Sequence, residues 1–299
     1  MKKHLIMLLL MWLLPLSSSW AQLQLFACEP EWASLAEELA GDKVVAYSAT
    51  TAYQDPHRIE ARPSLIAKLR RADLLVCSGA ELEQGWLPML LRKAANSKVQ
   101  PGQLGYLMAA EQVQRLDQPA VLDRSMGDVH ASGNPHVHFD PRRIAQIAAV
   151  LSERLQQLDQ ANSDYYQQRY QGFSQRWQQS IEQWQQQAAS LKGQRLVVHH
   201  KDWRYLFDWL GIEQAATLEP KPGIAPSAAH LASIKRLLAD SPARAVIYNS
   251  YQTDRAAKWL SGQADMPAVQ LPYSVGGSDK AVDLFSLFDD IIEKLLEVM

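Results

Sequence analysis

The sequence predicts an α/β protein of two lobes, each a parallel sheet flanked by helices, joined by one long strut helix. Short apolar runs alternate with segments of helical period both before residue 160 and after residue 193. Between them, one apolar stripe continues at helical spacing from Tyr166 to Leu191. The chain has 299 residues, which is more than one compact core usually needs.

Residues 1–21 have the pattern of a signal peptide. Two lysines precede an apolar run over residues 5–14, and Ser19-Trp20-Ala21 resembles a cleavage site. That run is too short to span a bilayer comfortably. We therefore expect export, with cleavage after Ala21. An alternative is lipid attachment at Cys28, because the residues before it loosely resemble a lipoprotein processing site.

Residues 22–160 predict the first lobe. Apolar runs indicate parallel strands, and the segments of helical period between them indicate covering helices. A proline in the first turn marks two of these helices. The expected strands are Leu23–Cys28, Lys43–Tyr47 and Asp73–Cys77, and the expected helices are Glu31–Ala40, Pro63–Arg71 and Pro141–Leu158.

Residues 161–192 predict the linking helix. At 1.5 Å per residue it would be roughly 40 Å long, so we expect a rigid strut that reaches both lobes. A helical hairpin arm or coiled coil is the alternative. Glutamines cover the other faces. The apolar stripe, with steps of three and four, consists of Tyr166, Tyr170, Phe173, Trp177, Ile181, Trp184, Ala188 and Leu191.

Residues 193–299 predict the second lobe, in which the alternation of strands and helices resumes. The two halves have similar strand and helix content without obvious sequence repetition. The expected strands are Arg195–His199, Ala245–Tyr248 and Ala268–Leu271, and the expected helices are Trp203–Leu210, Ala229–Asp240, Thr253–Gly262 and Val282–Glu297.

The two cysteines, Cys28 and Cys77, each end an apolar run. If those runs are adjacent parallel strands, the two Cα atoms would lie about 5 Å apart, within the range of a disulfide. Export would allow this bond to form. Two free, buried cysteines are the alternative.

Five of the eight histidines fall in three short segments far apart in the chain. Two of these segments place histidine directly after proline, in a turn opened by Asp or Asn, where little backbone entropy remains to be lost on binding. Neutral imidazole is the commonest protein ligand of metals. The segments therefore predict a transition-metal site in a cleft between the lobes. They are Asp55-Pro56-His57, Asn134-Pro135-His136-Val137-His138 and Val198-His199-His200.

With their neighbours, these segments resemble the zinc- and manganese-binding periplasmic proteins of bacterial ABC importers. The resemblance covers the chain after the leader, with its elements in order: Asp55–Glu60, Gly79–Leu87, Asn134–Pro141 and His200–Tyr205. It implies a binding protein that captures a divalent metal and delivers it to an ABC permease in the inner membrane. It also implies a periplasmic location and no catalytic residues.

The resemblance implies that His57, His136 and His200 bind the metal. Three imidazoles suit Zn²⁺ as the transported ligand, with Mn²⁺ as the alternative. The family often has a carboxylate as fourth ligand in a late loop, where this chain lacks one. Water, Glu60 or Asp279 would then take the fourth position.

The remaining histidines receive structural roles. His138 is expected to pack behind the site, and His199 to point away from it, as neighbours on a strand do. His130 is expected to be a solvated loop residue, in what is at most a remnant of the family's His- and Asp-rich loop. His230 is expected at the surface. The segment Glu219–Pro226 is expected to be a rigid loop at the cleft rim.

The net charge of −2 becomes more negative once the leader is removed, which argues against a nucleic-acid partner. We expect a monomer that is not an enzyme. A secreted zinc hydrolase with an open three-histidine site, using Glu60 as its base, is one alternative. An adhesin or scaffold that uses the glutamine-rich helix as a contact surface is another.

Overall fold

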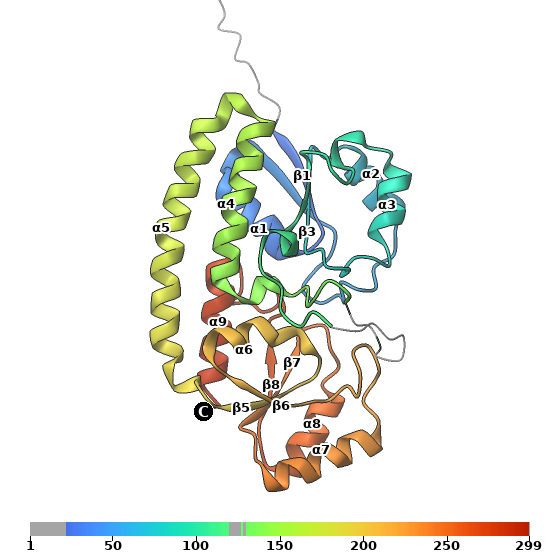
Figure 1. Cartoon of the computed structure of the whole chain (residues 1–299), viewed down its shortest axis with the longest axis vertical. Coiled ribbons are helices and arrows are strands. Elements are labelled where there is room, and N and C mark those ends of the chain that lie inside the picture. The colour runs from blue at the N-terminus through green and yellow to red at the C-terminus, as the bar shows by residue number, and fades with distance from the viewer. Residues whose placement is uncertain (1–21, 120–126, 128–129, 299) are drawn as a thin grey trace, which may run out of the picture.

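The computed structural model describes residues 22–119, 127 and 130–298, so the predicted signal peptide lies outside the described residues. The chain folds into two lobes, one above the other in Figure 1, with helix α5 (Ser163–Gln187) along one side of both. Each lobe contains a four-stranded, all-parallel sheet. The predicted fold class is therefore confirmed.

In the first lobe, three of the four strands are the predicted ones, and the fourth, β4, was not predicted. Three of its four longer helices begin with proline in the first turn at the predicted or an adjacent residue. The elements are β1 (Leu23–Ala27), α1 (Pro30–Ala40), β2 (Val44–Ser48), α2 (Pro63–Arg70), β3 (Leu74–Cys77), α3 (Leu87–Ala94), β4 (Tyr106–Met108) and α4 (Pro141–Leu158).

The second lobe again has one strand more than predicted, the edge strand β6. Its sheet order, β6-β5-β7-β8, repeats the order β2-β1-β3-β4 of the first sheet. The elements are β5 (Arg195–Val198), α6 (Arg204–Leu210), β6 (Glu213–Thr217), α7 (Ala228–Asp240), β7 (Ala245–Asn249), α8 (Arg255–Ala264), β8 (Ala268–Leu271) and α9 (Leu284–Leu296).

Helix α5 (Ser163–Gln187) is the predicted strut. Its apolar stripe is buried except at the half-buried Tyr170, and two tryptophans tie the helix to both lobes. Trp177 donates its indole N–H to the carbonyl of Pro141 at the start of α4, and Trp184 donates to Asp289 on α9. One core cluster includes residues of both sheets and of α5. Because the lobes share a core, wide hinge opening would break apolar packing.

In both sheets the strand order changes direction between the first and third strands in sequence, β1 and β3 or β5 and β7. The carboxyl ends of strands at such a switch point are where ligands bind in open α/β sheets. His200 follows β5 at the switch point of the second sheet, whereas His57 lies in the loop after β2, the strand beside β1. Within the described residues, no helix has the length and apolarity of a membrane span.

A disulfide joins Cys28 and Cys77 at the carboxyl ends of β1 and β3, with Cα atoms 4.7 Å apart. This confirms the bridge predicted from adjacent strands. It also argues against the lipid alternative, because the sulfur of Cys28 is already bonded to Cys77.

A pair of buried acids lies beside the disulfide. Both Glu29 and Glu83 receive hydrogen bonds from the backbone N–H of Ser78, and Glu83 also from Gly79. Burial raises the pKa of Glu83 to about 7, although its hydrogen bonds to Glu29 and to backbone N–H groups oppose the shift. Burial and repulsion from Glu83 raise the pKa of Glu29 well above its usual value.

We predict that this pair makes the protein less stable as the pH rises. A carboxyl whose pKa is raised by folding stabilises the fold fully below its unfolded pKa, and that contribution disappears as the pH passes the folded value. From pH 5 to 8 the free energy of unfolding should fall by roughly 3 kcal/mol through Glu83. Urea unfolding at pH 5 and at pH 8 measures this change in the free energy of unfolding. Glu83→Gln should flatten this slope, whereas the exposed Glu37→Gln should leave it unchanged.

Candidate metal centre

His57 is held in a loop between β2 and α2 by the predicted Asp turn. The carboxylate of Asp55 accepts the backbone N–H of His57 at 3.0 Å and the ring Nδ1–H at 2.8 Å. The carbonyl of Pro56 accepts the indole N–H of the buried Trp86 at 2.8 Å. The backbone and the ring of His57 are both fixed, and its Nε2 is directed inward.

His136 is held by the corresponding Asn turn. Asn134 accepts the backbone N–H of His136 at 3.0 Å, and its amide donates to the carbonyl of Lys201 at 2.9 Å. The hydroxyl of Tyr205 donates to the carbonyl of Asn134 at 2.7 Å. Asn134 thus connects the segments that contain His136 and His200, and only 1% of His136 is exposed.

His200 follows the end of β5. Its Nδ1–H donates to Glu219 at 2.6 Å, and Glu219 also accepts the backbone N–H of Gly223 at 3.0 Å. The loop that begins at Glu219 therefore orients this ring. Gly223, Ala225 and Pro226 line a cleft cavity of about 300 Å³ together with His57 and His200, which confirms the predicted rim loop.

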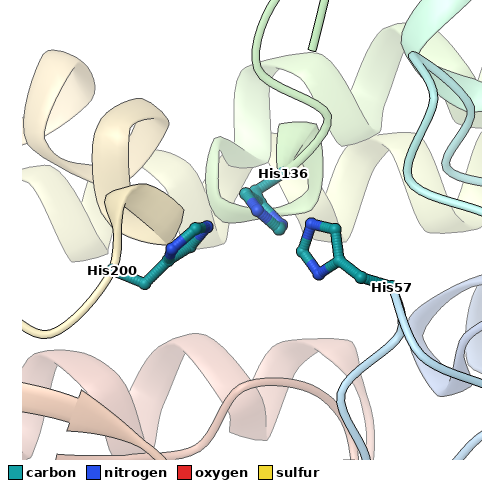
Figure 2. A group of neighbouring side chains, drawn as sticks. All are labelled: His57, His136 and His200. Carbon is teal, nitrogen blue, oxygen red and sulfur yellow. The ribbon is translucent and has the colours of Figure 1, made fainter. Parts of the chain in front are cut away.

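The three histidines meet between the lobes. Figure 2 shows their rings directed toward one another from three separate segments. The ring centroids form a nearly equilateral triangle with sides of 5.8, 5.9 and 6.0 Å. One ligand atom from each of His57, His136 and His200 lies within 4.8 Å of the other two. The predicted residues are thus brought together.

Each of the three rings has its Nδ1 beside an oxygen: Asp55 for His57, Glu219 for His200, and the hydroxyl of Tyr273, at 3.0 Å, for His136. Such partners fix the orientation of metal-binding imidazoles and leave the other nitrogen free. In each ring the nitrogen that these oxygens leave available to a metal is Nε2.

The rings differ in their charge. Burial, with the neighbouring imidazoles of His57 and His200, lowers the pKa of His136 well below its usual value. Burial would also lower the pKa of His200, but Asp202 and Glu219 outweigh this effect and raise it to about 9. At neutral pH and without a metal, the imidazole of His136 is therefore neutral and that of His200 is protonated.

Among the remaining histidines, His138 behaves as predicted. It is fully buried, donates from Nε2 to the carbonyl of Tyr273, and lies 3.3 Å from Glu31. His199 is also buried. His230 is half-buried rather than fully at the surface, with its ring 3.0 Å from the carbonyl of Thr217.

The prediction for His130 was wrong. Instead of a solvated loop position, its Nε2 lies 3.2 Å from Nε2 of His57, and it lines a small cavity of about 90 Å³ with His136 and His200. Burial, followed by the neighbouring imidazoles, lowers the pKa of His130 to about 3. Asp123 and Asp128, of the expected loop remnant, lie outside the described residues.

The two carboxylates predicted for the fourth position, Glu60 and Asp279, are exposed. The carboxylate that faces the free ring nitrogens is Asp202 instead, with Oδ1 3.2 Å from Nε2 of His136 and 3.7 Å from Nε2 of His200. Asp202 lies in the segment that carries the resemblance, two residues after His200, and was missed because its position in the sequence does not show where it points.

Curated relatives confirm the resemblance found in the histidine segments. The chain is 24% identical over 200 residues to the high-affinity zinc uptake system protein ZnuA of Yersinia pestis. The matched region covers 63% of each of the two chains. The chain is 28% identical over 145 residues to the manganese ABC transporter substrate-binding lipoprotein PsaA of Streptococcus pneumoniae, covering 43% of this chain and 46% of that one. The chain thus matches less than two thirds of the length of either relative.

Solved structures show the same fold. The crystal structure of ZnuA superposes with a TM-score of 0.78 over 93% of this chain and 99% of that chain, at 20% identity. The family model described as zinc-uptake complex component A, periplasmic, matches residues 26–298, nearly the whole described chain. The description names a component of an uptake complex and not an enzyme. The chain therefore belongs to the family of the periplasmic component A of zinc-uptake complexes.

Proposed function

We propose that this chain is a periplasmic solute-binding protein that captures one divalent metal, most readily zinc, and delivers it to an ABC permease in the inner membrane. His57, His136 and His200 bind the ion through Nε2. The lobes comprise residues 22–160 and 193–299, linked by residues 161–192, and the protein acts as a monomer without nucleic acid.

One observation carries this proposal: three imidazoles from distant segments converge, and each is oriented by an oxygen at Nδ1. Packing alone would not place three histidines around a common point while leaving Nε2 of the buried His136 without a hydrogen bond. A cation bound to these nitrogens would provide the missing partner.

The set of ligands favours zinc over manganese. Zinc is commonly bound by imidazole in four-coordinate sites, whereas manganese prefers more oxygen ligands and a higher coordination number. Relatives named for zinc and for manganese both occur, so the preference is argued from the residues of this chain. The shared core of the lobes favours metal release through a small movement of loops.

The zinc hydrolase alternative has lost its support. A hydrolase needs a base next to the metal-bound water, and Glu60, the residue named for this role, is exposed.

Metal content tests the proposal. Protein exported to the periplasm and purified without chelator should contain close to one zinc per chain by elemental analysis. In a competition titration with a chelating indicator, zinc should bind far more tightly than manganese. Less than a tenth of an equivalent of tightly bound metal in both experiments would rule the proposal out.

We predict that Glu219→Gln weakens zinc binding by about 10–100-fold. Carboxylates that hold the second nitrogen of a zinc-bound histidine typically contribute this much, and Glu219 is the partner of His200 Nδ1. The same titration measures it. Glu213→Gln, on the exposed edge strand β6, is the matched control and should bind as the unaltered protein does. Equal affinities for the two variants would contradict the role of Glu219.

A further inference from the structure

Asp202 is a fully buried acid beside the three imidazoles. It lies in the short 3₁₀ turn Lys201–Trp203, directly after His200. One carboxylate oxygen, Oδ2, accepts hydrogen bonds from the side-chain amides of Asn249, at the end of β7, and Gln252. These two bonds come from the end of β7, the strand beside β5 at the same switch point, and from the loop after it, so the carboxylate has a fixed direction.

The other oxygen, Oδ1, is buried and has no hydrogen-bond partner among the described residues. Nε2 of His136, 3.2 Å away, also lacks one. Native proteins rarely leave such groups unpaired, and an unpaired buried charge is especially costly. A cation bound by both atoms would satisfy both.

The distances agree with one tetrahedral site. Ligand atoms about 2.0–2.1 Å from a zinc ion are separated from one another by about 3.3 Å. Oδ1 lies 3.2 Å from Nε2 of His136 and 3.7 Å from Nε2 of His200. Asp202 therefore lies at about the separation of neighbouring ligands from two of the three nitrogens, those of His136 and His200.

We infer that Asp202 is the fourth ligand of the metal, giving the site three nitrogens and one anionic oxygen. This inference rests on the proposed function. The carboxylate offsets half of the charge of a divalent ion at a position that is itself fully buried. Its bond to the metal would explain why this acid is buried although Oδ1 has no hydrogen-bond partner among the described residues.

The competing ligand is His130, whose Nε2 lies 3.2 Å from Nε2 of His57. It would give a site of four nitrogens. Unlike Asp202, His130 is partly exposed and approaches only one of the three free nitrogens at this distance. The structure thus offers two distinguishable coordination sets.

Cobalt(II) spectroscopy separates them. Asp202→Asn should weaken zinc binding by about 100-fold or more and change the visible d–d bands of the cobalt-loaded protein. His130→Gln should leave the shape of these bands unchanged. It should change the zinc affinity by no more than about tenfold. Asp208→Asn, an exposed acid on α6, is the matched control for loss of one charge.

Asp202→Cys distinguishes a ligand from a residue that only positions the histidines. A thiolate bonded to cobalt produces a charge-transfer band in the near ultraviolet, and a thiol that does not touch the metal produces none. We expect this band. Its absence from a folded, cobalt-loaded variant would overturn the assignment of Asp202.

If the variants do not fold, X-ray absorption at the zinc edge of the unaltered protein decides. Outer-shell scattering should count three imidazoles, and a count of four would overturn the inference in favour of His130. Both results require that the unaltered protein binds zinc. If the unaltered protein binds no zinc, the proposed function itself fails. If it binds zinc but Asp202 is not a ligand, only the present inference fails.

Discussion

Alanine at position 136 should reduce zinc affinity on the order of 100- to 1000-fold. Structural zinc sites with four ligands are worth about 10–16 kcal/mol, so each ligand contributes about 3–4 kcal/mol, or two to three factors of ten. His136 is the most buried of the three imidazoles, and water would replace it poorly as a ligand at that depth. Competition with a chelating indicator measures the change.

His230→Ala is the control for this variant. It removes the same side chain from a half-buried position on α7 and should bind zinc as the unaltered protein does. Circular dichroism should show that both variants fold. A folded His136→Ala protein that retains full zinc affinity would show that the metal binds elsewhere.

Removing the disulfide should destabilise the fold by about 4 kcal/mol. Cys28 and Cys77 are 49 residues apart, and a cross-link over a loop of that length removes about this much chain entropy from the unfolded state. The double variant Cys28→Ala with Cys77→Ala avoids leaving buried thiols or hydroxyl groups unpaired. Urea unfolding at fixed pH provides the comparison.

The disulfide lies at the switch point of the first lobe, and its sulfur atoms group with Glu83 rather than with the three imidazoles. Zinc affinity of the folded double variant should therefore stay within about threefold of the unaltered protein. A loss of less than about 1 kcal/mol in unfolding free energy would mean that the unfolded chain is already restricted by other contacts.

Most of the fold followed from local patterns, because buried strands and amphipathic helices leave periodic apolar residues in the sequence. The prediction for Pro141–Leu158 matches α4 at both ends. The two missed strands are sheet edges. β4 has only three residues, and β6, at Glu213–Thr217, has no fully buried residue. Short or polar edge strands lack the apolar run that predicts a strand.

The sequence predicted those parts of the candidate site that local backbone turns determine. The turns at Asp55 and Asn134 can be read from the sequence, because Asx residues before proline accept local backbone N–H groups. The positions of His130 and Asp202 could not be read in this way. His130 lies beside a segment rich in Asp, Ser and Gly, a composition typical of solvated loops, so nothing in the sequence indicates that its ring approaches His57.

Anomalous diffraction at the zinc edge, from crystals of the protein loaded with one equivalent of zinc, tests the central claim most directly. The account predicts one strong peak between the lobes, roughly 2.0–2.1 Å from Nε2 of His57, His136 and His200. A peak elsewhere, or one bonded to fewer than two of these three nitrogens, would contradict it.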